Sequence, residues 1–172
     1  MTMPIGMVLL FLILLPGLFG LYVLNPIEHH IVDPFTTSLA HVSAFITHFF
    51  DGRVEAHGKQ LMNAATGYAV TIERGCNGVE AVIILVSAML AFPAPWKNRL
   101  IGIALGFVAI QALNLVRIIS LFYLGQWNQT WFEWFHLYLW QALIIIDALV
   151  VFLIWLRYLP PIEAAPAEAI AT

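Results

Sequence analysis

The sequence changes character within the stretch Glu73-Arg74-Gly75-Cys76-Asn77-Gly78-Val79-Glu80, where a polar segment gives way to a run of apolar residues. This stretch contains the only cysteine of the 172 residues. A thiol placed just before a helix lies near unpaired backbone N–H groups and the positive end of the helix dipole, which favour an anion. We therefore expect a lowered pKa for the Cys76 thiol, helped by the cations Arg74 and Arg117. The alternative is a small, buried packing residue.

The composition is that of an integral membrane protein. Hydrophobic residues make up 62% and charged residues 10% of the chain, whereas about a quarter of an ordinary soluble domain is charged. The net charge of -3, with only seven Lys and Arg, argues against nucleic acid as a partner. One cysteine excludes an intramolecular disulfide and a cysteine-rich metal cluster. The sequence has no Walker, dinucleotide-binding or HExxH motif, so we expect no cofactor and no metal site.

We predict an all-α fold with four transmembrane helices, because four apolar runs approach the length that crosses a bilayer. These runs cover residues 5–24, 77–92, 100–123 and 136–155. The first lacks the basic start and the cleavage site of a signal peptide, which is the alternative for it. Residues 1–158 then form one membrane-embedded domain. Residues 159–172, rich in Pro and Ala, are expected to be a disordered cytoplasmic tail.

Two further elements are expected outside the spans. Asp33-Pro34 resembles an N-cap followed by a helix start, and an apolar stripe then recurs at helical spacing: Phe35, Leu39, Val42, Ile46 and Phe49. The run is short for a span, so we predict an interfacial helix whose stripe covers the site as a flap. A helix spanning the bilayer at 35–50 is the alternative. Residues 52–74 alternate in polarity around a turn at 57–59, which predicts a small extracytoplasmic hairpin.

Three residues far apart in the sequence are predicted to meet at one leaflet. The short turn containing Lys97 and Arg99 is expected in the cytoplasm, which places Cys76, Arg117 and His136 near the extracytoplasmic ends of their helices. An intramembrane arginine is costly and therefore points to a function. Together the three could perform acyl transfer, with a thiol nucleophile, an imidazole base and acid, and a guanidinium for the oxyanion.

Two acidic residues in the predicted spans, Glu80 and Asp147, allow structural interpretations. Arg117 could instead balance Glu80, one turn below the cysteine, or extend toward the headgroups. Asp147 is expected near mid-bilayer, protonated or hydrogen-bonded to Gln111 or Ser87, and its role is open.

Three motifs carry a resemblance to a known family: Cys76-Asn77-Gly78, Asn114-Leu115-Val116-Arg117 and the downstream His136. They resemble the exosortase/archaeosortase family, and the short chain is most similar to the small exosortase H type. Asn77 stands where that family usually has serine. The resemblance implies catalytic roles for Cys76, Arg117 and His136, with supporting roles for the neighbours Asn77, Gly78, Glu80 and Asn114.

The resemblance also implies a membrane cysteine protease or transpeptidase in the bacterial inner membrane, with its site on the extracytoplasmic side. Its expected partners are the lipid bilayer and membrane-anchored proteins that end in a short motif, a transmembrane helix and a basic cluster. A link to surface or exopolysaccharide export is implied as well. A non-catalytic scaffold of an export complex is the alternative. A redox-sensing protein is disfavoured because Cys76 has no second cysteine to pair with. The sequence leaves open the sorting motif, the acceptor and the oligomeric state.

Overall fold

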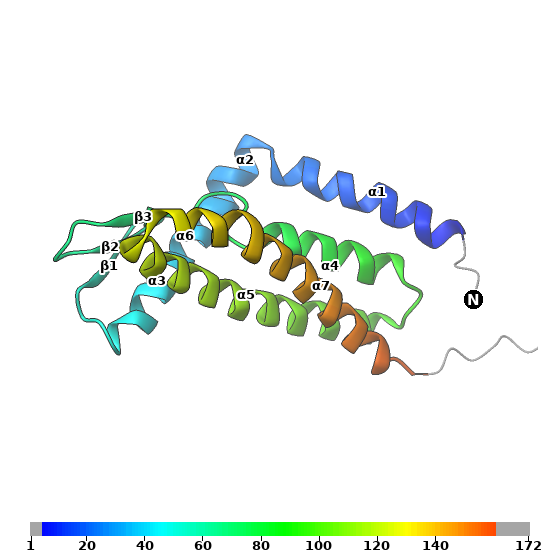
Figure 1. Ribbon diagram of the computed structural model, residues 1–172. Coiled ribbons are helices and arrows are strands. Elements are labelled where there is room, and N and C mark those ends of the chain that lie inside the picture. Colours follow the sequence, from blue (N-terminus) through cyan, green and yellow to red (C-terminus); the bar gives the residue numbers. More distant parts are fainter. Residues whose placement is uncertain (1–4, 161–172) are drawn as a thin grey trace, which may run out of the picture.

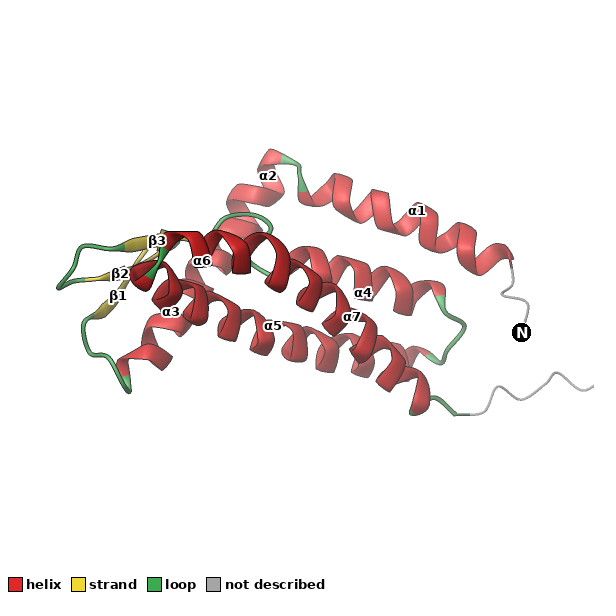
Figure 2. Cartoon of the chain, viewed as in Figure 1, coloured by secondary structure: helices red, strands yellow, loops and turns green. Residues whose placement is uncertain are grey.

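The computed structural model describes residues 5–160. Helices α1 (Ile5–Tyr22), α4 (Val79–Ala91), α5 (Trp96–Trp127) and α7 (Trp140–Arg157) form a bundle (Figure 1). Helix α4 contacts the other three and is therefore the centre of the bundle. A small sheet and helix α3 (Asp33–His48) lie together at one end, and the strands are confined to that end (Figure 2).

Three helical segments are long and apolar enough to cross a membrane: α1, α5 and the run Gln129–Arg157. Helix α4 has 13 residues. At about 1.5 Å per residue it is roughly 20 Å long, short of a hydrocarbon core of about 30 Å. The four predicted spans thus correspond, within residues 5–160, to three helices of spanning length and one shorter helix. The predicted stop before Pro93 is confirmed, because α4 ends at Ala91.

The tryptophan-rich segment expected to be a loop is helical. Helix α5 continues to Trp127, and only Asn128 separates it from α6 (Gln129–Trp134), a five-residue π-helix η2 (Phe135–Leu139) and α7. The Asn128 Oδ1 accepts hydrogen bonds from the backbone N–H of Thr130 and Trp131, at 2.9 and 3.2 Å. This cap starts a new helix at once. His136 therefore lies inside a helical run. The prediction that it is the first residue of the last span is wrong.

The N-cap predicted at Asp33 is also wrong. Two short helical segments, α2 (Asn25–Ile27) and the π-helix η1 (Glu28–Val32), run directly into α3. The carboxylate of Asp33 instead contacts Lys59 Nζ at 3.0 Å and His29 Nδ1 at 3.3 Å. Asp33 thus links this helical run to the sheet.

The packed face of α3 differs from the predicted apolar stripe. Its buried residues are mostly small: Thr36, Leu39, Ala40, Ser43, Ala44 and Thr47. Val42 and Phe49 are exposed. Small residues let membrane helices approach closely, and the hydroxyls of Thr36 and Thr47 are satisfied by carbonyls one turn earlier, at 2.8 and 2.7 Å.

A three-stranded antiparallel sheet replaces the predicted hairpin. Its order is β1 (Val54–His57), β2 (Gln60–Asn63), β3 (Ala69–Thr71). The middle strand was missed, because four residues alternate too briefly to be recognised. One face buries Val54 and Leu61, together with Ile72 just beyond β3, against α3 and the sheet-side half of α5. The sheet is thereby fixed to the bundle, and the loop after β3 leads to Cys76.

Candidate active site

Cys76 lies in the bend between β3 and α4, half-buried, three residues before the first residue of α4. One N–H at the helix start is engaged by the neighbouring residue, because Val79 donates to Asn77 Oδ1 at 3.1 Å. Burial raises the pKa of the Cys76 thiol above its usual value, and Glu73 and Glu80 act in the same direction against the charge of Arg117. The predicted lowering of this pKa is wrong.

The structure brings the three residues of the predicted constellation together. The Cys76 Sγ lies 3.8 Å from both ring nitrogens of His136. It also lies 3.8 Å from Nη2 of Arg117. These contacts join residues separated by 60 and 41 positions in the chain.

Arg117 is held by the loop that carries the thiol. Its side chain is almost fully buried, and Nη1 donates to the Gly75 carbonyl at 3.0 Å. Within residues 5–160 it forms no ion pair with Glu80, and its burial excludes the headgroup-facing alternative. Arg74, expected to act on the thiol, pairs instead with Glu28 at 2.6 Å. Arg117 is thus the cation that contacts the sulfur.

The His136 ring is stacked on an aromatic neighbour. Phe132, one turn earlier, lies parallel to it, with ring centroids 5.6 Å apart and 5° between the planes. Sequence reasoning missed Phe132 because it treated the segment as a loop. In a helix, the i,i+4 spacing would have indicated the contact.

Asn77 is the centre of a buried polar network. It is fully buried, its Nδ2 donates to Thr36 Oγ1 at 3.2 Å, and its Oδ1 accepts from the Tyr22 hydroxyl at 3.5 Å. The residue next to the thiol therefore joins α1, α3 and the start of α4. Neither Tyr22 nor Thr36 carries a sequence signal for this role, because the contacts span 55 and 41 positions.

Gly78 and Asn114 fit together at the start of α4. Gly78 has φ +74°, and a Cβ there would come within 3.2 Å of the Asn114 side chain and 3.0 Å of Gln111 Nε2. Asn114 is fully buried and donates to Gln111 Oε1 at 3.4 Å. Only glycine suits this combination of backbone angle and close approach. The contact between Gly78 and Asn114 therefore fixes the end of the loop that carries Cys76. Glu80 lies in the first turn of α4.

Asp147 does not form the hydrogen bond expected with Ser87 or Gln111. Ser87 Oγ donates to the Ile83 carbonyl at 2.7 Å, and Gln111 Oε1 accepts from Asn114 at 3.4 Å. The buried Oδ2 of Asp147 has no hydrogen-bond partner among the described residues. A protonated carboxyl, the other expectation for this residue, stays a prediction.

A cavity of ≈190 Å³ opens onto the thiol. It is bordered by β3 with the following loop, by α5, and by Phe132 and His136. None of the residues in the predicted α3 stripe lines it, so the flap hypothesis fails for this cavity. A thiol with an imidazole and a guanidinium at a cavity can attack a carbonyl and protonate its leaving group.

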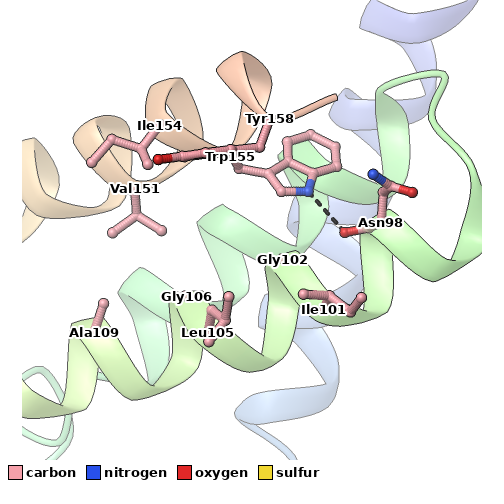
Figure 3. Close-up of a pocket in the computed structure, with 10 residues that line it drawn as sticks. All are labelled: Asn98, Ile101, Gly102, Leu105, Gly106, Ala109, Val151, Ile154, Trp155 and Tyr158. Atoms are coloured by element: carbon pink, nitrogen blue, oxygen red, sulfur yellow. Dashed lines mark hydrogen bonds between the residues drawn. The ribbon is translucent and has the colours of Figure 1, made fainter. Parts of the chain in front are cut away.

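A larger cavity of ≈580 Å³ lies between α5 and α7, at the end of the bundle away from the sheet (Figures 1 and 3). It is lined mostly by apolar and small side chains, and Trp155 Nε1 donates to the Asn98 carbonyl at 2.9 Å beside it. Gly102 permits this arrangement, since a Cβ there would come within 2.3 Å of Trp155. Tyr158 is the one acid or base among the residues that line it, without a thiol, imidazole or carboxylate beside it, so we assign the acyl-transfer chemistry to the smaller cavity.

Metal-ligating side chains do not gather in the described part of the chain, where no group of three or more His, Cys, Asp or Glu could hold an ion.

Comparison with known families gives one match. A family model described as Transmembrane exosortase matches residues 2–156, a range that includes Cys76, Arg117 and His136. No match was found among curated proteins or among solved structures. The family match covers most of the chain, and the apolar helices agree with its membrane character. The chain belongs to the transmembrane exosortase family.

Proposed function

We propose that this protein is a membrane cysteine protease, acting as a transpeptidase, that cleaves C-terminal sorting signals of exported proteins. Cys76 is the nucleophile, His136 the general base and acid, and Arg117 the group that holds the developing oxyanion. The observation that carries the proposal is the position of the Cys76 Sγ, 3.8 Å from His136 and from Arg117 at the mouth of a cavity.

The raised thiol pKa requires a base in the attacking step. The thiol proton passes to His136 as Sγ bonds to the scissile carbonyl carbon, and the carbonyl oxygen becomes negative beside Arg117. The imidazolium then protonates the leaving amine as the C–N bond breaks, which leaves a thioester on Cys76. Water or an amine acceptor attacks this thioester and regenerates the thiol.

The resemblance to exosortases implies a substrate class and a location, which we adopt as part of the proposal. We propose substrates that end in a short motif, a transmembrane helix and a basic cluster, processed at the extracytoplasmic face of the bacterial inner membrane. The short chain favours the small exosortase H type. Glu80, Asn77, Gly78 and Asn114 support the loop and do not contact the substrate. The family match does not favour the scaffold alternative.

Replacing the thiol tests this proposal. We expect Cys76→Ala to insert and fold normally but to abolish processing, because alanine cannot form the thioester. The measurement uses a membrane-anchored reporter library with a randomised motif before a transmembrane helix and a basic cluster, scored for cleavage per inserted enzyme. His136→Ala should fail similarly, and His41→Ala, which changes an exposed histidine on α3, serves as its control. Processing by Cys76→Ala at a rate near wild type would refute the nucleophile assignment.

A further inference from the structure

The sheet has an open edge beside the thiol. Strand β3 is last in the order β1-β2-β3, so no strand among residues 5–160 pairs with its other side. Toward β2, the Ile72 N–H donates to the Lys59 carbonyl and the Tyr68 carbonyl accepts from Asn63 N–H, both at 2.9 Å. Backbone groups alternate in direction along an antiparallel strand. The N–H and C=O groups of Ala69 and Thr71, at the alternate positions, therefore point away from β2.

This edge borders the cavity that contains the thiol. Val70, Thr71 and Ile72 line it on one side, and Phe132 and His136 line it on another. Strand β3 and helix α6 accordingly lie next to each other at this end of the molecule (Figure 1). The chain then runs from β3 through residues 73–75 to Cys76. Of the two residues with outward backbone groups, Thr71 therefore lines the same cavity as the nucleophile, and Ala69 continues the edge beyond it.

The open edge itself favours an extended occupant. A strand added beside β3 would lie about 4.8 Å from it, the ordinary spacing of neighbouring strands. Its backbone could then pair with the outward N–H and C=O groups of β3, whereas the backbone N–H and C=O groups of a helix are already paired within the helix.

We propose that the scissile segment of the substrate binds as an added strand along the open edge of β3, hydrogen-bonded to the backbone of Ala69 and Thr71. This proposal rests on the proposed function and adds how the site recognises its substrate. Strand addition provides affinity through main-chain hydrogen bonds and specificity through alternate side chains. The sorting motif is then read at every second residue, by the side chains that point toward Val70 and Phe132.

A backbone scan of a thiol-directed peptide tests this on the wild-type protein in lipid nanodiscs. The probe is acetyl-tetraalanyl chloromethyl ketone. The Cys76 Sγ bonds to its methylene carbon, the C–Cl bond breaks, chloride leaves, and the thiol proton passes through His136 to solvent. Four further probes each carry one N-methyl group on a different alanine nitrogen. Methylation should slow labelling at alternate positions, by about fivefold or more where a hydrogen bond to β3 is lost. Equal effects at all four positions would overturn the proposal.

A proline substitution tests the same edge from the protein side. Thr71→Pro removes the outward N–H, which an edge strand tolerates. Relative to Thr71→Ala, which removes only the hydroxyl that accepts from Gln60, the ratio of peptide labelling to iodoacetamide labelling should fall about fivefold. Ala56→Pro removes an outward N–H from the opposite edge, β1, and should label like wild type with both reagents.

Different results would overturn strand addition and the proposed function. An unchanged ratio in Thr71→Pro would overturn strand addition while leaving the thiol chemistry intact. A wild-type Cys76 that reacts with neither reagent would overturn the proposed function itself. The scan with N-methylated probes uses only wild-type protein, so it tests strand addition even if the proline disturbs the sheet.

Discussion

Replacing Arg117 by lysine tests whether its guanidinium acts in catalysis or only supplies a structural charge. The arginine makes two contacts from two nitrogens, Nη1 to the Gly75 carbonyl at 3.0 Å and Nη2 to Cys76 Sγ at 3.8 Å. A lysine ammonium is a point donor on a flexible stem, so it can keep one of these contacts but not both. The positive charge stays, and the fork geometry is lost.

The size of the expected effect follows from the contact that lysine loses. A hydrogen bond to a charged group is worth about 1.5–3 kcal/mol, and about 1.4 kcal/mol corresponds to a tenfold change in rate. We therefore expect Arg117→Lys to be about 10- to 150-fold slower than wild type. Arg117→Ala removes the charge as well and should lose about a hundredfold to a thousandfold, as for an oxyanion donor.

The assay is the rate of reporter cleavage divided by the amount of inserted protein. Arg99→Lys is the matched control, because Arg99 also donates to a backbone carbonyl, that of Phe92 at 2.8 Å, but at the other end of α5. It should stay within about threefold of wild type, since it lies outside the site. An Arg117→Lys rate within the same range would mean that Arg117 only balances charge, and the mechanism above would be wrong.

Two further predictions concern the loop around the thiol. The rate of Cys76 alkylation by iodoacetamide should rise with pH, with a midpoint above the ordinary thiol pKa of about 8.5, because burial disfavours the thiolate. Arg117→Ala should raise this midpoint because it removes a positive neighbour of the thiolate, and Glu73→Gln should lower it because it removes a negative one. Shifts of the same sign would contradict this electrostatic account. Gly78→Ala should destabilise the protein by about 1–3 kcal/mol through backbone strain plus crowding, measured by thermal unfolding in detergent. Gly67→Ala, with nearly the same φ of +73° but open space around its Cβ, isolates the strain, so equal losses in both would exclude the crowding at Asn114.

Sequence reasoning located the three residues around the sulfur because each lies near the end of an apolar run. Depth along a helix follows from its constant rise per residue, so Cys76, Arg117 and His136 could be assigned to one level. Errors in the predicted helix boundaries did not change this assignment. His136 stays at that level although the segment before it, residues 125–135, is mostly helical where a loop was expected.

The remaining features depend on contacts that no local pattern encodes. The pKa of Cys76 was predicted from its distance to a helix start, but its burial depends on how β3, α5 and α6 meet around it. The packed face of α3 could not be predicted from apolar periodicity, because in a membrane large apolar side chains can face lipid while small ones pack between helices. The Asn77 network joins α1 and α3 through single hydrogen bonds across the chain.

The structure favours a neutral thiol–imidazole pair over a preformed ion pair. A buried thiolate would stand beside two carboxylates, Glu73 and Glu80, with Arg117 as the opposing charge. In the proposed mechanism, proton transfer to His136 is therefore favourable only as the carbonyl accepts the sulfur's electrons, which moves negative charge from Sγ to an oxygen that Arg117 can bind. The 3.8 Å separation of sulfur and ring nitrogens must shorten for this step, and catalytic contacts of this kind commonly tighten when substrate binds. A peptide strand inserted between β3 and Phe132 would exclude water from the same space and strengthen the interaction of Arg117 with the oxyanion. Substrate binding and thiol activation are then one event, so Cys76 in the free site should react slowly but measurably with small electrophiles, which limits unproductive chemistry.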